Sequence, residues 1–419
     1  FVSAYDFIPK DSFIGKYIEY MSGQETPLIY DFMCACWALS IAVGRECYVN
    51  RPKAPVRLNL YVVLSSDSGV TRKSTSVRVA TNLVRDFLTD TDSKLILIES
   101  KITTGQLQYE LYNATKAHGY AHVAISASEL AAVLSRSGGL SGLPALLTDL
   151  YDCPDTRIGG GTVMMGGGYN LRNVYASFIA GSTPSWLMRA VTPAIIEGGF
   201  TSRCYFIDGS ARKRNVAWPE EGDDNDKREE LRRQLREIAG RAGSVGRIEV
   251  GSSAIESFKQ WYNARSHHAD AYRASFEARE DAHILRFAAL LAVNSDDWLV
   301  NVHHLKAAIS IVSRIKSDGQ RLFSGTVVDR NDIRLVEKVR AELLAASVSG
   351  LSQSDILRAM RPKYRSEQVR SVLTVMHELD LVQRFSVESS GRPKTIWRAT
   401  IYLGNDDLYK ESINKLGIA

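Results

Sequence analysis

The sequence has few cysteines and no long hydrophobic run, and both shortages narrow what the protein can be. Its five cysteines are scattered among 419 residues and odd in number. Without the paired spacing of a zinc site, they indicate buried thiols in a reducing, cytoplasmic compartment. No apolar run approaches the roughly 18 residues of a membrane span, so we expect no membrane partner. We see no signal peptide at the start of the sequence. The sequence begins at Phe1 rather than Met, so whether a further domain precedes it stays open.

Charge of either sign is also not in large excess. Lysine and arginine total 52 against 47 acidic residues, a formal net charge of +5. That balance says little by itself, and the places where positive charge gathers say more. The hydrophobic fraction of 45% is typical of a globular protein, and the length is enough for two or three domains.

One loop of the chain, within residues 58–76, lacks the two glycines that the pattern of a phosphate-binding P-loop requires. Residues 58–76 read as an apolar strand, a tight turn and a helix that begins near Lys73, which is the layout of a phosphate-binding P-loop. In the usual G-x-x-x-x-G-K-[ST] pattern the two glycine positions are Asp67 and Arg72 here, and the only glycine is Gly69. A side chain at position 72 is unfavourable where backbone must approach phosphate.

The loop nevertheless keeps the groups that bind a nucleoside triphosphate. Backbone N–H groups can cradle phosphate, the Lys73 amine can reach the β- and γ-oxygens, and the Ser74 hydroxyl can ligate Mg²⁺. The predicted nucleotide-binding residues of the loop are Gly69, Val70, Thr71, Arg72, Lys73, Ser74 and Thr75. The alternative is an ordinary strand-turn-helix with a solvated Arg-Lys pair.

Short apolar runs alternate with helical segments along the first half of the chain. Continuous apolar content is typical of central parallel strands, so the pattern predicts a three-layer α/β domain. The predicted strands are 58–65, 94–99, 121–126, 175–182 and 202–207. The predicted organisation is an N-terminal helical segment (1–54), a P-loop ATPase core (55–210), a charged insertion and helical lid (211–325), a winged helix (331–400) and a C-terminal tail (401–419). The charge-dense part of the insertion predicts a solvated helix.

Three further groups of candidate catalytic residues lie at the ends of predicted strands. Glu129 follows the third predicted strand, taken to neighbour the loop strand, and is placed to polarise an attacking water opposite Lys73. The fourth strand ends in Ser182 and Thr183, where a hydroxyl can sense the γ-phosphate; an equally open alternative is a helix N-cap before a proline. Arg203 precedes the fifth strand and is a candidate arginine finger, with a surface salt bridge as the alternative.

A glycine-rich segment, 151–173, lies between Glu129 and the fourth strand. Two glycine-rich turns around Met164 and Met165 predict a projecting hairpin with Arg157 and Arg172 at its base. Such a hairpin could grip a nucleic-acid backbone, and a flexible surface loop is the alternative.

The C-terminal region predicts three helices followed by a β-hairpin, including a Ser352-capped helix over 352–360. This arrangement is a winged helix, a variant of helix-turn-helix. Polar and basic residues gather on the third helix and the wing, as in a nucleic-acid binder. They are Arg361, Lys363, Arg365, Gln368, Arg370, Arg392 and Lys394. The alternative is a winged helix used for protein contacts, or simply a charged surface.

Taken in order, these motifs resemble AAA+ replicative helicases. The residues that carry the likeness are Lys73-Ser74, Glu129, Ser182-Thr183 and Ser202-Arg203. The likeness is nearest to the minichromosome-maintenance (MCM) helicases and the MCM-like replication ATPases of phages and mobile elements, and it covers roughly residues 55–400. Arg279 and Arg286 are similar to that family's sensor-2 arginines and join the predicted nucleotide-binding set. No counterpart of the family's N-terminal oligonucleotide-binding fold or zinc site is visible.

The resemblance implies a homohexameric ring that hydrolyses ATP with Mg²⁺ at subunit interfaces and translocates on DNA as a helicase in replication. Two alternatives stay open. One is a DNA-binding scaffold or initiator with a degenerate nucleotide pocket, which the residues at 67, 72 and 128 favour. The other is an ATPase switch in a defence system, which shares most of these features.

Overall fold

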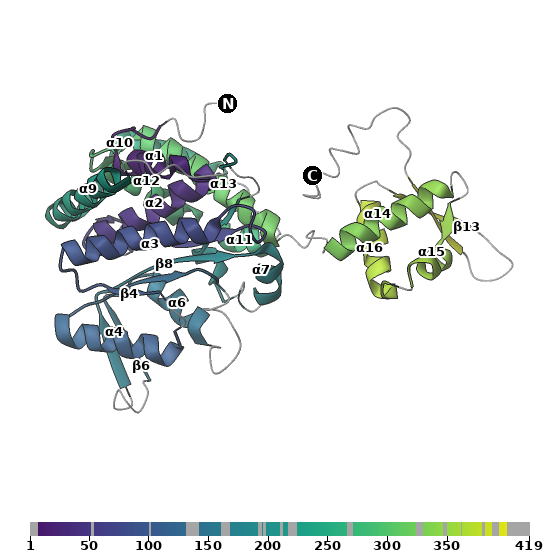
Figure 1. The fold of residues 1–419 in the computed structure, drawn as a ribbon, viewed down its shortest axis with the longest axis horizontal. Helices are drawn as coiled ribbons and strands as arrows, with labels where there is room; N and C mark the ends of the chain where they lie inside the picture. Colours follow the sequence, from purple (N-terminus) through teal and green to yellow (C-terminus); the bar gives the residue numbers. More distant parts are fainter. Residues whose placement is uncertain are drawn as a thin grey trace. The chain divides into compact units, whose positions relative to one another are not determined.

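In this computed structural model, the chain divides into two compact units, Phe1–Leu322 and Phe323–Ala419 (Figure 1). The structure describes residues 7–51, 54–99, 102–130, 142–160, 168–191, 195, 198–209, 213–216, 224–265, 271–323, 330–346, 350–361, 363–378, 382–387 and 394–399. The predicted N-terminal and core segments, and the predicted lid as far as Leu322, belong to the larger unit. The predicted tail, 401–419, lies outside the described residues.

A parallel five-stranded sheet forms the centre of the larger unit. Its order is β4-β5-β8-β3-β9, and every pairing is parallel. The strands are β3 (Tyr61–Ser65), β4 (Ile96–Ile98), β5 (Ala121–Ala127), β8 (Val174–Ser182) and β9 (Tyr205–Asp208). All five overlap the predicted runs. Every residue of β3 and β8 is buried, which accounts for their unbroken apolar and small-residue sequences.

Helices cover both faces of this sheet and confirm an α/β fold. Figure 1 shows α2 and α3 on one side, and α4 and α6 on the other. The helices of these layers are α1 (Phe13–Tyr20), the short 3₁₀ turn η1 (Met21–Gly23), α2 (Leu28–Val43), α3 (Lys73–Asp90), α4 (Thr104–His118) and α6 (Leu143–Tyr151). Helix α2 is buried along nearly its whole length, so the N-terminal segment is part of the core.

The charged insertion forms the expected helix, but only one face of it is solvated, because the other face docks on α3. It forms α9 (Asp224–Val245), in which Leu231 and Leu235 are fully buried. Its arginines reach carboxylates of α3: Arg232 pairs with Asp90 at 2.6 Å, and Arg228 and Arg236 make similar pairs. Sequence spacing shows that a helix is charged but not that its partners lie on another helix.

The remaining elements of the larger unit form a second small sheet and a helical layer. The sheet has the order β11-β10-β1-β2. Its strands are β1 (Tyr48–Val49), β2 (Val56–Arg57), β10 (Arg247–Val250) and β11 (Leu299–Val300). The helices are α7 (Pro184–Ala190), the 3₁₀ turn η4 (Thr201–Arg203), α10 (Ser252–Asn263), α11 (Ala271–Glu277), α12 (Glu280–Asn294) and α13 (Val302–Phe323). Asn294 accepts the Ile14 N–H at 2.8 Å, which ties this layer to α1.

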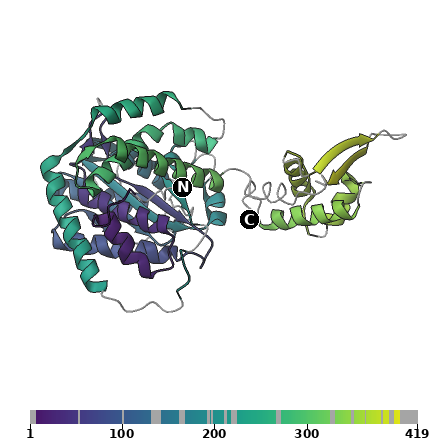
Figure 2. The same ribbon diagram turned by 90° about the horizontal axis from the view of Figure 1, so that it is seen from above.

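The smaller unit has the order helix, strand, two helices, two strands. Its elements are α14 (Arg330–Ala345), β12 (Leu351–Ser352), α15 (Gln353–Met360), α16 (Ser366–Glu378), β13 (Val382–Val387) and β14 (Lys394–Ala399). Figure 2 shows β13 and β14, in yellow, as a hairpin beside the helices. Leu335, Ile356 and Leu373 are fully buried at the centre of its core. Ser352 Oγ accepts the Asp355 N–H at 3.2 Å, which confirms the predicted cap.

A buried carboxyl joins α2 to the segment after β9. Asp31 is fully buried, accepts a hydrogen bond from Thr26 Oγ1 at 2.6 Å, and lies 3.1 Å from Lys213 Nζ. Burial raises its pKa to about 7, while Thr26 and Lys213 act in the opposite direction. Because the folded state holds this proton more tightly than the unfolded state does, stability falls as pH rises from about 4 to 7.

Replacing Asp31 by Asn is expected to remove this pH dependence. The loss of free energy of unfolding between pH 4 and pH 8 should shrink by about 2–4 kcal/mol relative to the wild type, following the size of the pKa change. Urea unfolding at both pH values measures it, with Asp11→Asn as control because the Asp11 side chain is 99% exposed. An unchanged pH dependence in Asp31→Asn would contradict the expectation.

Candidate functional site

The candidate phosphate loop connects the end of β3 to the start of α3, and hydrogen bonds to two other elements and within the loop support it. Ser66 N–H donates to the Ser182 carbonyl at 3.3 Å, which joins the loop to β8. The Tyr30 hydroxyl of α2 donates to the Ser65 carbonyl at 2.7 Å. Thr71 bonds to Ser66 within the loop. These hydrogen bonds hold the start of the loop in place at the carboxyl ends of the central strands.

Arg72 has the backbone conformation for which the usual pattern provides glycine. Its φ and ψ are 53° and 32°, in the left-handed region, which costs a non-glycine residue roughly 1–2 kcal/mol. Its Nε donates to Glu25 at 2.8 Å, and the same buried carboxylate accepts the Val216 N–H at 3.1 Å. The guanidinium is thus held by the segment between α1 and α2.

Lys73 is buried, with only 5% exposure, which contradicts the alternative of a solvated Arg-Lys pair for the lysine, whereas the Arg72 side chain is 58% exposed. Its Nζ donates to the Ser66 carbonyl at 3.3 Å and has no carboxylate partner among the described residues. The N–H groups of Thr75 and Ser76 bond to the Arg72 carbonyl, whereas those of Lys73 and Ser74 have no partner in the described part of the chain. An amine and free N–H groups at a helix N-terminus form an anion-binding arrangement.

Two buried hydroxyls lie at the carboxyl ends of β3 and β8. Ser65 Oγ and Ser182 Oγ are buried without a hydrogen bond among the described residues, on paired positions of β3 and β8. A buried orphan polar group requires a water or a ligand. These orphans fit a site for phosphate oxygens, with the Ser74 hydroxyl exposed one residue beyond Lys73.

Glu129 lies at the same carboxyl end of the sheet as the loop. It follows β5, which is one strand further from β3 than predicted. β8 lies between β5 and β3, so the strand before Glu129 does not neighbour the loop strand. The turn is nevertheless fixed to the end of β8, because Leu130 N–H donates to the Gly181 carbonyl at 2.6 Å. A Cβ at Gly181 would lie 2.5 Å from the Ser128 carbonyl and 3.6 Å from Lys73 Cδ. Only glycine therefore allows these segments to approach, and the Glu129 side chain is exposed.

Thr183 has the structural role that was its alternative. Its Oγ1 accepts the Trp186 N–H at 3.3 Å and caps α7. The orphan hydroxyl of Ser182 remains as the phosphate-sensing candidate of this pair.

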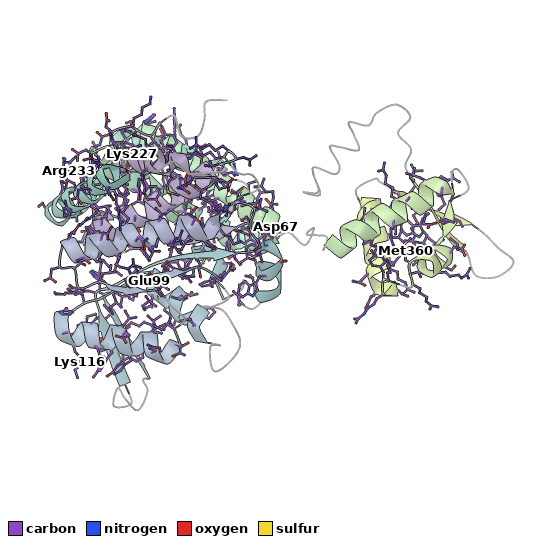
Figure 3. The ribbon with its side chains drawn as sticks, viewed as in Figure 1. Asp67, Glu99, Lys116, Lys227, Arg233 and Met360 are labelled. Carbon is purple, nitrogen blue, oxygen red and sulfur yellow. The ribbon has the colours of Figure 1, made fainter. Side chains whose placement is uncertain are left out.

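An acidic residue beside the loop was missed by the sequence reasoning. Asp208 ends β9 opposite Ser65, and its pKa is raised by burial and by Asp67, while Arg321 and Arg314 of α13 act against the rise. Arg321 lies 3.4 Å from Asp208, and Figure 3 labels Asp67. The only signal in the sequence was an aspartate directly after a buried strand.

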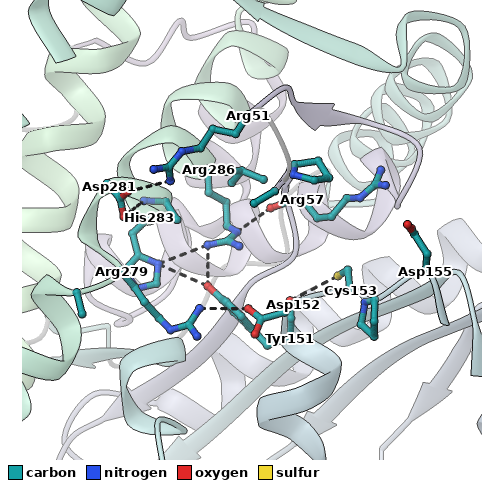
Figure 4. Close-up of a pocket in the computed structure, with 16 residues that line it drawn as sticks. Arg51, Arg57, Tyr151, Asp152, Cys153, Asp155, Arg279, Asp281, His283 and Arg286 are labelled. Carbon is teal, nitrogen blue, oxygen red and sulfur yellow. Dashed lines mark hydrogen bonds and ion pairs between the residues drawn. The ribbon is translucent and has the colours of Figure 1, made fainter. Parts of the chain in front are cut away.

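Arg203 lies at the amino ends of the central strands, whereas Lys73 lies at their carboxyl ends. It precedes β9, whereas Lys73 follows β3, and the two strands are parallel. Its Nη2 donates to Asp152 at 2.7 Å and its Nη1 to the Gly199 carbonyl at 2.9 Å. Arg279 donates to the other oxygen of Asp152 at 3.1 Å (Figure 4). The salt-bridge alternative is therefore present, as a pair of arginines sharing one carboxylate.

Arg286, on the same helix as the residues that follow Arg279, is held in a buried hydrogen-bond network. Its Nη1 donates to the hydroxyls of Tyr151 at 2.7 Å and Tyr205 at 3.2 Å. His283 contacts the Ser202 carbonyl at 2.9 Å through Nε2. Burial and the neighbouring Arg286 hold the pKa of His283 well below its usual range, so the neutral ring donates from Nε2. Helix α12 thus anchors the turn that carries Arg203.

The predicted hairpin is present as β6 (Thr156–Gly160) and β7 (Gly168–Arg172). Arg157 and Arg172 lie at its base, as predicted. Arg157 is not free, because it donates to Asp149 at 2.8 Å and lies 5.5 Å from the centre of the Tyr169 ring. Ile158 is 76% exposed. Met164 and Met165 fall outside the described residues.

The polar residues predicted for DNA contact in the smaller unit are mostly exposed. Those with exposed side chains are Arg361, Lys363, Arg365, Gln368 and Arg370. Gln368 accepts the Arg365 N–H at 3.0 Å, so part of its bonding capacity caps α16. Arg392 and the Lys394 side chain lie outside what the structure describes. The sequence reasoning missed Arg398, which stacks 5.0 Å from the partly exposed Phe385 ring on the hairpin.

Neither a scan against protein-family models nor a search of curated proteins finds a match to this chain. Within the described residues, no three His, Cys, Asp or Glu side chains are grouped to hold a metal ion. None of the described helices combines the length and the apolar character needed to cross a bilayer.

Proposed function

We propose that this protein is an ATP hydrolase that acts on DNA, as a ring-forming helicase or translocase. The observation that carries the proposal is the buried Lys73 amine at the start of α3, without a carboxylate partner among the described residues. A buried cation left without an anion is unfavourable, and a triphosphate supplies the missing charge.

The residues at the carboxyl edge fit the parts of a phosphoryl-transfer site. Lys73 would contact the β- and γ-phosphates, and Ser182 would contact the γ-phosphate. Ser74 would ligate Mg²⁺, which neutralises the developing charge when it is bound. Glu129 would orient and deprotonate the attacking water, since its turn is fixed to β8 at the strand end where Lys73 passes.

The position of Arg203 supports an assembly in which sites lie between subunits. An arginine at the opposite end of the central strands from its own Lys73 cannot serve its own loop, so any nucleotide that Arg203 contacts would belong to another protomer. A head-to-tail contact of this kind gives a ring when its rotation closes and a filament when it does not, and the resemblance favours a closed hexamer. Arg279 would act beside Arg203.

Two parts of the chain support DNA as the partner. The β6–β7 hairpin presents an exposed Ile158. The smaller unit has the helix and strand order that supports a winged helix, with basic residues exposed around α16.

A second candidate function is a DNA-binding scaffold, initiator or defence switch with a weak nucleotide site. Ser128 favours it, because the turn after β5 then offers only one carboxylate, Glu129, and none to support Mg²⁺. A scaffold would bind DNA equally well without ATP, whereas a ring motor would couple the two.

The test is ATP turnover by the wild-type protein with and without single-stranded DNA. We expect measurable hydrolysis that rises several-fold on adding DNA, together with displacement of a strand from a forked duplex. Turnover that is absent, or that DNA does not change, while DNA binding persists, would favour the scaffold.

A further inference from the structure

The small sheet of the smaller unit, in the order β12-β14-β13, packs only one of its faces on the core. Val382 of β13 and Trp397 and Ala399 of β14 belong to that core. Because successive side chains of a strand point to opposite faces, the residues between them lie on the face away from the core. We call this the outer sheet face, and its residues on the β13–β14 hairpin (Figure 2) are Gln383, Phe385, Ile396 and Arg398.

The outer sheet face exposes an aromatic ring. The Phe385 side chain is 38% exposed, and Ile396, which lies opposite it on β14, is half-buried. A single exposed ring is common on protein surfaces and indicates nothing by itself. The groups that surround Phe385 therefore decide what the ring is suited to bind.

Positive charge without a counter-charge surrounds this ring. β13 and β14 carry Arg384, Lys394 and Arg398 but no aspartate or glutamate. Within the described part of the chain, the two arginines contact rings instead of carboxylates. Arg384 lies 5.9 Å from the centre of the Trp397 ring, and Arg398 lies 5.0 Å from that of Phe385. Arg398 Nε is also buried without a hydrogen-bond partner among the described residues. The hairpin therefore attracts anions.

An exposed ring beside unpaired arginines matches the chemistry of an unpaired nucleotide. The phosphate supplies the missing negative charge, and the base has a flat face that stacks on an aromatic ring or on a guanidinium plane. Within a duplex, each base face is covered by the next base pair, so a protein meets phosphates and groove edges there instead. The ring of Phe385 gains a stacking partner only from a base that is not enclosed in a duplex. An acidic protein would supply charge but no such row of flat faces.

We propose that the outer sheet face binds single-stranded nucleic acid, with Phe385 stacking on a base and Arg398 contacting an adjacent phosphate. This site is separate from the basic residues around α16, and it adds a contact that only unpaired bases make. A chain that uses both contacts would favour a junction between duplex and single strand. The inference rests on the proposed function in taking DNA as the partner, and ATP hydrolysis does not enter it.

The test measures binding of the full chain, without ATP, to a fluorescent oligothymidine of about 16 nucleotides and to a duplex of the same length, by fluorescence anisotropy. Phe385→Leu keeps an apolar side chain but removes the ring. We expect it to bind the single strand at least ~5-fold more weakly, the loss of one stacked base, with little change for the duplex. Phe385→Tyr keeps the ring and should bind like the wild type. Arg398→Gln should weaken single-strand binding and lower its salt-dependence slope by about 0.7, the value for one phosphate.

A cross-linking measurement and two control variants locate the contact, because other parts of the chain also offer basic groups. Oligothymidine that carries iodouracil should cross-link on irradiation to the peptide that contains Phe385, and this cross-link should be lost in Phe385→Leu. Leu344→Ala removes an exposed apolar side chain of α14, and Arg358→Gln removes an exposed arginine that pairs with Asp355. Neither control should change single-strand binding. The melting temperature of Phe385→Leu should match the wild type, because the ring lies outside the core.

Three results would overturn the proposal. The first is wild-type binding of the single strand by Phe385→Leu, and the second is a loss that is equal for single strand and duplex. The third is tighter binding of polyglutamate than of oligothymidine, dependent on Phe385, which would assign the face to an acidic protein. A chain without ATP turnover that shows the expected losses keeps this inference and loses the motor. A DNA-stimulated ATPase in which Phe385→Leu changes nothing loses only this inference.

Discussion

Lys73→Ala is expected to reduce ATP turnover by about 10²–10³-fold, the usual loss when one preorganised donor to a developing charge is removed. The amine contacts only the Ser66 carbonyl in the described structure, so its bonding capacity is reserved for an anion. Deleting it leaves no buried carboxylate unpaired among the described residues. The melting temperature without nucleotide should therefore stay within a few degrees of the wild type, or rise.

This combination separates a functional lysine from a structural one. The measurements are steady-state turnover, nucleotide affinity and thermal unfolding of the same preparations. Lys94→Ala is the matched control, because Lys94 is a half-exposed surface lysine paired with Asp92, and it should keep full activity. If Lys73→Ala unfolds much more easily while turnover per folded molecule is unchanged, the amine is a structural group and the motor proposal fails.

The central sheet could be predicted from the sequence because its strands are short, apolar and buried on both faces. β3 and β8 have no exposed residue, so nothing interrupts their apolar pattern. Strand order was not predictable. The position of β8 between β5 and β3 depends on which crossovers pack together, and Glu129 follows a strand that is one further from the loop than expected.

Pairings between distant segments account for most of what the sequence did not reveal about the site. The partner of Arg72 is Glu25, and that of Arg203 is Asp152, 47 and 51 residues away in the chain. Residue type gives the charge of such a side chain but not the direction in which the fold turns it.

Within one chain, Lys73 and Arg203 lie at opposite ends of the central strands, and this separation allows a complementation experiment. Arg203→Ala is expected to lower turnover by at least about 10²-fold, as for an arginine that stabilises charge on the transferred phosphate. The fold should tolerate it, because Asp152 keeps Arg279 as a partner at 3.1 Å. If each active site combines Lys73 of one protomer with Arg203 of the next, the two inactive variants carry complementary defects.

Mixing Lys73→Ala and Arg203→Ala subunits in equal amounts should therefore restore activity. With random assembly and independent sites, about a quarter of the interfaces of a head-to-tail ring contain both an intact lysine and an intact arginine. Turnover of the mixture should approach that fraction of the wild-type rate, after a dissociation step that allows subunits to exchange. A mixture of Lys73→Ala with itself after the same treatment is the control, and co-purification of untagged Arg203→Ala with tagged Lys73→Ala shows whether subunits exchange at all. Recovery is impossible if both residues serve the same chain, so a mixture as inactive as its components, despite proven exchange, would exclude a site shared between protomers.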